Sequence, residues 1–289
     1  LTLLPQNGEE VAHMWDGMLK IMELQDAFHA KHPRLTTEAV LDFMIFDREN
    51  PGSIFRCLRA TRENAHAVRG TLTSELWETS NGTWLKMRDF TLPKMMESGP
   101  EAFFEWVKYR SHLSRGVTIG TMLQDEALRF IRLGTFLERA DNTARLLDVK
   151  FHARNTEFFG SGAGNEGKEV DFYHWSAVLR SVSAFEVYRK VYRNVIRPEK
   201  VAELLILRQD MPRSLHASLN EVMSNLQLVS SDPGSDTLRH AGKLRAELAY
   251  GRIDEILATG LHAYLTQFLD SVNALGSRIS REFLLPQTV

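Results

Sequence analysis

Cysteine is nearly absent from this sequence, and its scarcity already narrows the class of protein. Only Cys57 is present among 289 residues, so the chain has no second cysteine for an internal disulfide, which suits a reducing compartment. No apolar run approaches the roughly 20 residues that a membrane helix needs. Residues 1–10 also lack the basic start and long apolar centre of a secretory signal. We therefore expect a cytoplasmic protein with no membrane partner.

A surplus of positive charge is also missing. The chain has 35 Lys and Arg against 37 Asp and Glu, giving a formal net charge of −2. A general nucleic-acid binder needs excess Lys and Arg to neutralise phosphates, so we expect no nucleic-acid partner. The hydrophobic content of 43% is ordinary for a globular protein, and the length is enough to bury a sizeable core.

The sequence also has no convincing stretch in which apolar and polar residues alternate, the pattern expected of a half-buried β-strand. Helical periods dominate instead, and the connections between them are short, which favours antiparallel neighbours. The sequence therefore predicts an all-α, multi-helix bundle of roughly ten mostly antiparallel helices, forming a single domain over residues 1–289 with a flexible Gly-rich loop at 160–168. The expected helices cover residues 9–30, 36–49, 53–79, 83–97 (bent or divided by Pro93), 101–115, 121–152, 171–196, 198–207, 210–229, 236–250 and 253–283.

The stretch from Gly120 to His152 is the longest without proline, and its helical period is unbroken. One stripe at three- and four-residue spacing is apolar, and a second stripe at the same spacing is charged. The charged stripe lies beside the apolar one, so its groups would be half covered and must pair or bind something. The apolar stripe is Leu133, Leu137, Ala140, Ala144, Leu147 and Phe151; the charged stripe is Glu138, Asp141, Arg145, Asp148 and His152.

Residues 136–148 of this stretch, Phe-Leu-Glu-Arg-Ala-Asp-Asn-Thr-Ala-Arg-Leu-Leu-Asp, resemble the signature of the alpha-E family, a bacterial all-helical family named for a Glu-Arg motif. The resemblance covers nearly the whole chain, since further pieces at 42–51, 60–65, 179–184 and 207–214 read in the same order. Members usually open with a first helix that bears its own Glu-Arg-Ala-x-x-Thr-Ala-Arg-type run. No such helix precedes Pro5, so a site shared between two such helices would be incomplete here.

Alpha-E proteins are similar to components encoded beside, or fused to, circularly permuted ATP-grasp ligases and transglutaminase-like or proteasome-like peptidases. The resemblance therefore implies a helical partner or catalytic component of an ATP-grasp amide (peptide) ligase. Its substrate would be a small amino acid or peptide. ATP and magnesium are expected on the partner ligase, and no cofactor on this chain. The alternative from another class is a purely structural protein whose Glu-Arg stripes hold helices and ligase together.

The candidate catalytic residues lie on the charged stripe and beside it. A carboxylate next to the core, with guanidiniums nearby, suits the orientation or activation of an amine or carboxylate substrate. Glu138 would then hydrogen-bond or deprotonate the attacking amine. The other interpretation is a structural ion-pair network, because Asp141 and Arg145 are direct i,i+4 neighbours. The candidate set is Glu138, Arg139, Asp141 and Arg145.

A second set of candidates lies on the helix expected at 53–79. Arginines with a titratable histidine suit a phosphate or carboxylate, and the residues just before this helix could complete such a pocket. The other interpretation is a solvated helix face. The set is Arg59, Arg62, Glu63, His66 and Arg69, completed by Asp47 and Arg48.

The connection at 208–214 carries a third set, because a helix N-terminus with an arginine on each side is a natural anion site. The set is Arg208, Asp210 and Arg213. The other interpretation makes Asp210 simply the N-cap. With the resemblance, we expect arginines near Arg62, Arg145 and Arg213 to bind the acceptor amine or the acyl-phosphate end.

A third function class is a ferritin-like di-metal protein. Glu63-x-x-His66 and Glu10-x-x-His13 match the Glu-x-x-His pattern of di-iron bundles. Such a site would need carboxylates from two further helices, for which Glu138 and Glu186 are nominated. The pattern is short and common by chance, so our expectation is no metal.

Overall fold

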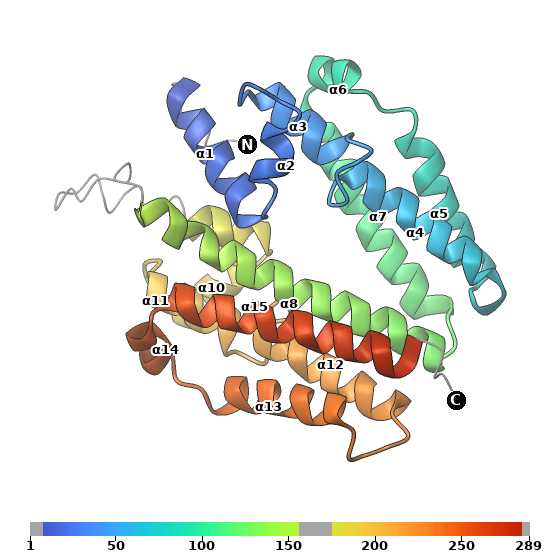
Figure 1. Ribbon diagram of the computed structural model, residues 1–289, viewed down its shortest axis with the longest axis vertical. Coiled ribbons are helices and arrows are strands. Elements are labelled where there is room, and N and C mark those ends of the chain that lie inside the picture. Colours follow the sequence, from blue (N-terminus) through green and yellow to red (C-terminus); the bar gives the residue numbers. More distant parts are fainter. Residues whose placement is uncertain (1–7, 156–174, 285–289) are drawn as a thin grey trace. The chain divides into compact units, whose positions relative to one another are not determined.

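The computed structural model describes residues 8–155 and 175–284, and within these ranges the chain is helical and contains no strand (Figure 1). The chain divides into two compact units, Leu1–Leu128 and Arg129–Val289. That the whole chain behaves as one domain stays a prediction. No helix among the described residues is long and apolar enough to cross a membrane.

The first unit is built from short helices around two small apolar clusters. α4 packs against α5, and α5 packs against α7, so these three helices lie side by side (Figure 1). One cluster gathers around Phe28 and Phe43, the other around Met87 and Phe103. The elements are α1 (Gly8–Ile21), α2 (Gln25–His29), α3 (Thr37–Ile45), α4 (Ile54–Ala67), η1 (Arg69–Thr71), α5 (Ser74–Met87), α6 (Leu92–Ser98) and α7 (Pro100–Thr121).

Two expected helices of this unit were wrong because the chain turns inside them. The helix expected at 9–30 is broken between α1 and α2, where Glu23 takes a left-handed φ of 57°. The helix expected at 53–79 ends at Ala67. A new helix, α5, starts behind Thr73, whose hydroxyl accepts from the Leu76 amide. The Asn-Gly pair at 81–82 does not end a helix but lies inside α5.

The later boundaries of this unit were also misplaced. The stretch expected at 83–97 is divided rather than bent, because α5 ends at Met87 and α6 begins at Leu92, with Pro93 in its first turn, where the missing N–H costs nothing. α7 continues past the expected stop at 115–116 to Thr121. The long central helix α8 (Glu126–Asn155) therefore starts later than expected, with the Asp125 carboxylate accepting from the Leu128 amide. The cap predicted at Thr121 was wrong.

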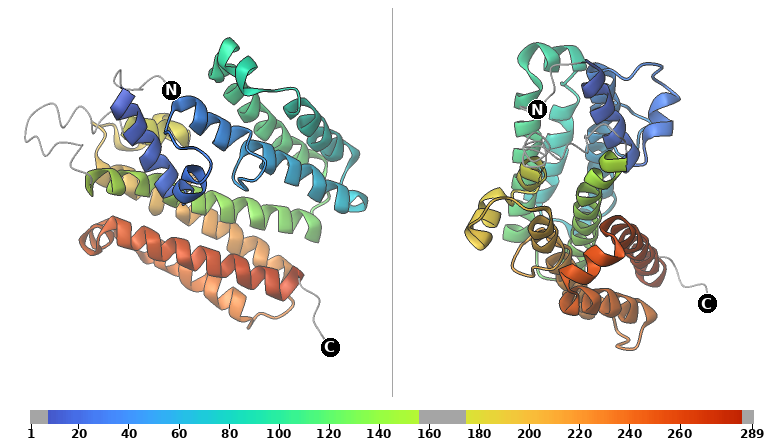
Figure 2. Two further views of the ribbon diagram at one scale, coloured as in Figure 1. Left: turned by 45° about the horizontal axis from the view of Figure 1, so that its top comes forward. Right: turned by 90° about the vertical axis from the view of Figure 1, so that its left-hand side faces the viewer.

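The second unit has one large continuous core. The described part of α8 packs its buried side chains, Leu133, Ala140, Ala144 and Leu147, into this core with residues from the later helices. α12 pairs with α13, and α13 with α15 (Figure 2). After the helical residues 175–181 come α10 (Phe185–Tyr192), α11 (Pro198–Ile206), α12 (Leu215–Val229), α13 (Asp236–Tyr250), α14 (Ile253–Thr259), α15 (Leu261–Ile279) and the short π-helix η2 (Ser280–Leu284).

Turns also divide two helices expected in this unit. The stretch expected at 171–196 is interrupted at Ser183, which has a φ of 54°, and the stretch at 253–283 is interrupted at Gly260, with a φ of 100°. Glycine has no side chain to clash at that angle, so it can start α15 abruptly. The Gly-rich loop at 160–168 lies outside the described residues. Among the described residues, the helices are thus more numerous than the roughly ten expected and several are shorter, while the all-α class is confirmed.

Candidate functional site

The two residues of the Glu-Arg pair on α8 have different surroundings. Arg139 is half-buried; its guanidinium donates to the backbone carbonyl of Pro212 at 3.2 Å and lies 4.7 Å from the ring centre of Phe136. Glu138 is exposed, and among the described residues its carboxylate has no hydrogen bond or ion pair. Adjacent residues on a helix point about 100° apart, which explains why one side chain faces the protein and the other faces solvent.

α8 also holds the connection between α11 and α12. The buried hydroxyl of Thr143, one turn beyond Arg139, donates to the carbonyl of Arg213 at 2.9 Å. The next residue, Ser214, caps α12 by accepting from the Ala217 amide, and its hydroxyl donates back to the Arg208 carbonyl at 2.5 Å. These bonds satisfy backbone groups that the ends of the two helices leave open. Arg139 and Thr143 therefore fix the corner formed by residues 207–214.

Asp141 and Arg145 form the i,i+4 ion pair that their spacing predicts. The Arg145 Nε donates to the Asp141 Oδ2 at 2.9 Å, and both side chains are 20% exposed. A pair that is mostly covered holds its partners in place more firmly than an exposed one. That either residue contacts a substrate stays a prediction.

The corner itself has Arg208 clasping Asp210 through two hydrogen bonds, 2.8 and 2.5 Å long. The Arg208 guanidinium lowers the pKa of the Asp210 carboxyl below its usual range. The alternative that Asp210 is an N-cap was wrong, because α12 starts four residues later behind Ser214. Arg213 lies immediately before that cap; a ligand at Arg208, Asp210 or Arg213 stays a prediction.

Four residues of the predicted stripe, Arg59, Arg62, Glu63 and His66, lie on α4, whereas Arg69 lies beyond its end on η1. Most of these side chains contact α5. Arg59 pairs with Glu63 at 2.7 Å. Arg62 donates to the Asn81 side chain at 3.3 Å and lies 5.8 Å from the ring centre of Trp77. His66 and Arg69 approach the same tryptophan ring, at 5.7 and 5.1 Å.

Asp47 is occupied by the protein. Its carboxylate accepts from Lys31 and from the amides of Glu49 and Asn50 in the turn before α4. Burial raises the pKa of this carboxyl, but the Lys31 bond and the two amide bonds together outweigh burial and leave the pKa below its usual range. These contacts show that Asp47 stabilises the turn before α4. Ligand binding by Asp47 stays a prediction.

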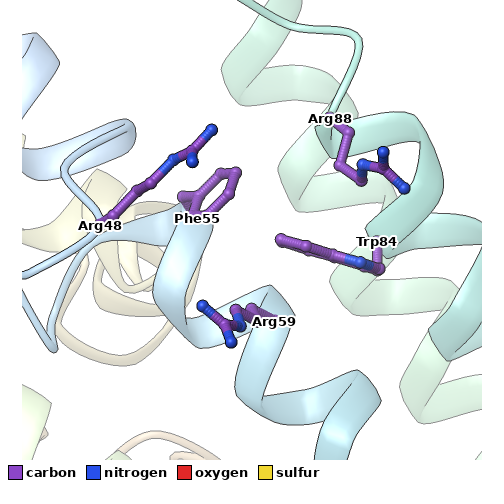
Figure 3. Close-up of a pocket in the computed structure, with 5 residues that line it drawn as sticks. All are labelled: Arg48, Phe55, Arg59, Trp84 and Arg88. Atoms are coloured by element: carbon purple, nitrogen blue, oxygen red, sulfur yellow. The ribbon is translucent and has the colours of Figure 1, made fainter.

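The structure places Arg48 and Arg59 around one cavity of about 410 Å³ in the first unit (Figure 3). Three further residues line it, and we did not single them out in the sequence: Phe55, Trp84 and Arg88. A signal was there, because Phe55–Arg59 and Trp84–Arg88 are both aromatic–arginine pairs at i,i+4, the spacing that puts two side chains on one helix face.

A metal centre finds no support. Within residues 8–155 and 175–284, no three or more His, Cys, Asp or Glu side chains come together as metal ligands. Glu63 is engaged by Arg59, and Glu186 is exposed. The side chains of Glu10 and His13 lie outside the described part of the chain.

The predicted arginine set near Arg62, Arg145 and Arg213 draws on both units. Arg62 belongs to the first, and the other two belong to the second. Within the second unit, Arg145 and Arg213 are both tied to α8, the former through Asp141 and the latter through the bond from Thr143. That the three bind one substrate stays a prediction.

Comparison with known proteins gives one finding. Neither the curated proteins nor the solved structures contain a match to this chain. A family model described as "a predicted alpha-helical domain with a conserved ER motif" matches residues 2–284. Glu138-Arg139 is the single Glu-Arg dipeptide in the sequence, and the helix that carries it is the long α8 described above. The chain belongs to the Alpha-E family.

Proposed function

We propose that this chain is the helical component of an ATP-grasp amide ligase system. It binds an amine or anionic substrate at the surface of α8, while the partner carries ATP and magnesium. Membership in the family, with its likeness to components encoded beside ATP-grasp ligases, supports this choice of system. The observation that carries it on the structural side is Glu138, an exposed carboxylate without a partner on a helix whose neighbouring motif residues are fixed.

In this proposal a carboxylate oxygen attacks the γ-phosphorus of ATP on the partner, ADP leaves and an acyl phosphate forms. The amine nitrogen attacks the acyl carbon, the bond from that carbon to the phosphate oxygen breaks, and phosphate leaves. Glu138 accepts a hydrogen bond from the amine and takes up the proton released as the amide forms. Arg139 is a positioning residue, since its contact with Pro212 holds the surface from which Glu138 projects.

The test is ATP turnover by the partner ligase, with and without this chain, across amine and carboxylate acceptors. We expect turnover to depend on the chain and to fall at least tenfold with Glu138→Gln, which keeps the size of the side chain but removes its charge and basicity. Glu199→Gln is the matched control, because Glu199 is an exposed glutamate of the same unit and should leave turnover unchanged.

One observation favours a second candidate function, that of a structural partner without chemistry. Arg139 and Thr143 bond to backbone carbonyls of the 207–214 corner, which is the work of a scaffold. Under this alternative, Glu138→Gln leaves turnover intact while the complex still forms. Turnover that is indifferent to the chain itself would remove the ligase proposal.

A further inference from the structure

We propose that the cavity lined by Arg48, Phe55, Arg59, Trp84 and Arg88 is a binding site for a small organic polyanion. The ligand would carry at least two carboxylate or phosphate groups on a compact body. We call this cavity the arginine pocket. All five residues belong to the first unit, so the inference does not rest on the ligase proposal and needs no partner protein.

The first argument concerns charge. Arg48 and Arg88 have no acidic partner among the described residues, and both are exposed. Arg59 is bonded to Glu63 through its Nε alone, which leaves the two outer nitrogens of its guanidinium to donate. Three guanidiniums on one cavity repel one another unless an anion lies between them, and the planar fork of arginine binds carboxylate and phosphate with two parallel hydrogen bonds.

The acidic residues nearest in sequence do not neutralise the pocket, because each already has a basic partner. Asp47 and Glu49 bond to Lys31, at 2.7 and 2.9 Å. Asp89, next to Arg88, lies 3.5 Å from Lys86. Glu63 on α4 pairs with Arg59, so one of the three positive charges of the pocket has a partner, whereas Arg48 and Arg88 have no acidic partner among the described residues.

The second argument concerns shape. Phe55 and Trp84 meet edge to face with ring centres 4.9 Å apart, and both pack on the apolar cluster around Met87 and Phe103. The floor is thus fixed by a core. Arg48 extends over the Phe55 ring, 5.3 Å from its centre. Figure 3 shows the guanidiniums of Arg48, Arg59 and Arg88 distributed around this aromatic pair.

The third argument concerns size. A cavity of about 410 Å³ lies near the lower end of the roughly 300–1,000 Å³ typical of small-molecule sites. A monatomic anion would leave most of it empty, whereas it has room for a compact di- or tricarboxylate, a diphosphate or an organic phosphate. The apolar floor accepts the carbon body of such a ligand, and the arginines accept its anionic groups.

Binding to the full chain can be measured by isothermal titration calorimetry with three probes: citrate, pyrophosphate and acetate. We expect citrate, pyrophosphate or both to bind one to one, and acetate to bind at least tenfold more weakly because it offers one anionic group. Citrate alone would identify a carboxylate ligand and pyrophosphate alone a phosphate ligand. If neither binds, the proposal is overturned.

Substitution then locates the site. Arg48→Gln and Arg88→Gln should each weaken binding about tenfold or more, while circular dichroism stays unchanged because neither arginine contributes to the core. Arg115→Gln is the matched control; this arginine is exposed in the same unit, does not line the pocket and should bind like wild type. Equal loss in the control, or full binding by both pocket variants, would refute the assignment.

Discussion

Two arginines from each unit show two different uses of the same side chain. In the second unit, Arg139 donates to the Pro212 carbonyl and Arg208 forms two hydrogen bonds to Asp210, so both guanidiniums have a partner within the chain. In the first unit, Arg48 and Arg88 face a cavity and have no acidic partner among the described residues. The two uses differ because different hydrogen-bond acceptors lie within reach of the guanidiniums. A corner between two helices presents backbone oxygens, whereas a floor of aromatic rings presents none.

The largest expected effect comes from the core under the Glu-Arg pair. Leu147→Ala removes a fully buried side chain of α8 and should lower the free energy of unfolding by about 2–5 kcal/mol, from lost burial and a residual cavity. Urea denaturation followed by circular dichroism measures this. Leu123→Ala is the matched control, since Leu123 is 77% exposed and should change little. A similar loss in both variants would contradict the role assigned to the core.

A smaller effect should separate the two residues of the motif. Arg139→Gln removes the hydrogen bond to the corner and should cost roughly 1 kcal/mol of stability. Glu138→Gln should stay within about 0.5 kcal/mol of wild type, as surface substitutions do, and so should Arg88→Gln. Thermal melting of the three variants side by side tests the contrast; a destabilised Glu138→Gln would show that this carboxylate supports the fold.

The smallest expected effect depends on pH and compares Asp47 with Asp210. The pKa of each carboxyl is lowered in the folded protein, so its charge stabilises the fold above the ordinary pKa of about 3.8. That contribution is lost as the pH falls through the lowered pKa. Wild type should therefore be more stable than Asp47→Asn near neutral pH, and the gap should close in acid.

The gap should be smaller for Asp210→Asn, because the Asp210 side chain is 63% exposed and solvent screens its bond to Arg208, while the Asp47 side chain is 11% exposed. Urea midpoints measured on a pH series from about 6 down to about 3 give both gaps. A gap that stays constant with pH would show that the charge of the carboxylate is not what matters.

Periodicity predicted the fold class and the buried face of α8, where Leu133, Ala140, Ala144 and Leu147 all enter the core. It missed several turns that lack proline, as at Glu23 and Ser183, where single residues take left-handed φ angles that the helical period does not reveal. Family signatures placed the Glu-Arg pair correctly on a long helix but gave no way to tell which residue faces the protein.

The candidate site was predictable only where partners are close in sequence. Asp141 with Arg145 and Arg59 with Glu63 follow from i,i+4 spacing. The bonds from Arg139 to Pro212 and from Thr143 to Arg213 join residues about 70 positions apart. Arg88 joins the arginine pocket only because α4 and α5 pack together. Such contacts depend on the tertiary structure and cannot be deduced from the spacing of residues along the sequence.

The single cysteine has a practical consequence. Cys57 is exposed on α4, midway between Phe55 and Arg59. Two residues along a helix correspond to a turn of about 200°, so its thiol projects on the side of α4 away from the arginine pocket. The unaltered chain thus offers one attachment point for a maleimide fluorophore. A dye there would be attached to the far side of a helix that lines the pocket, so it would not block the pocket and could report binding of a colourless ligand.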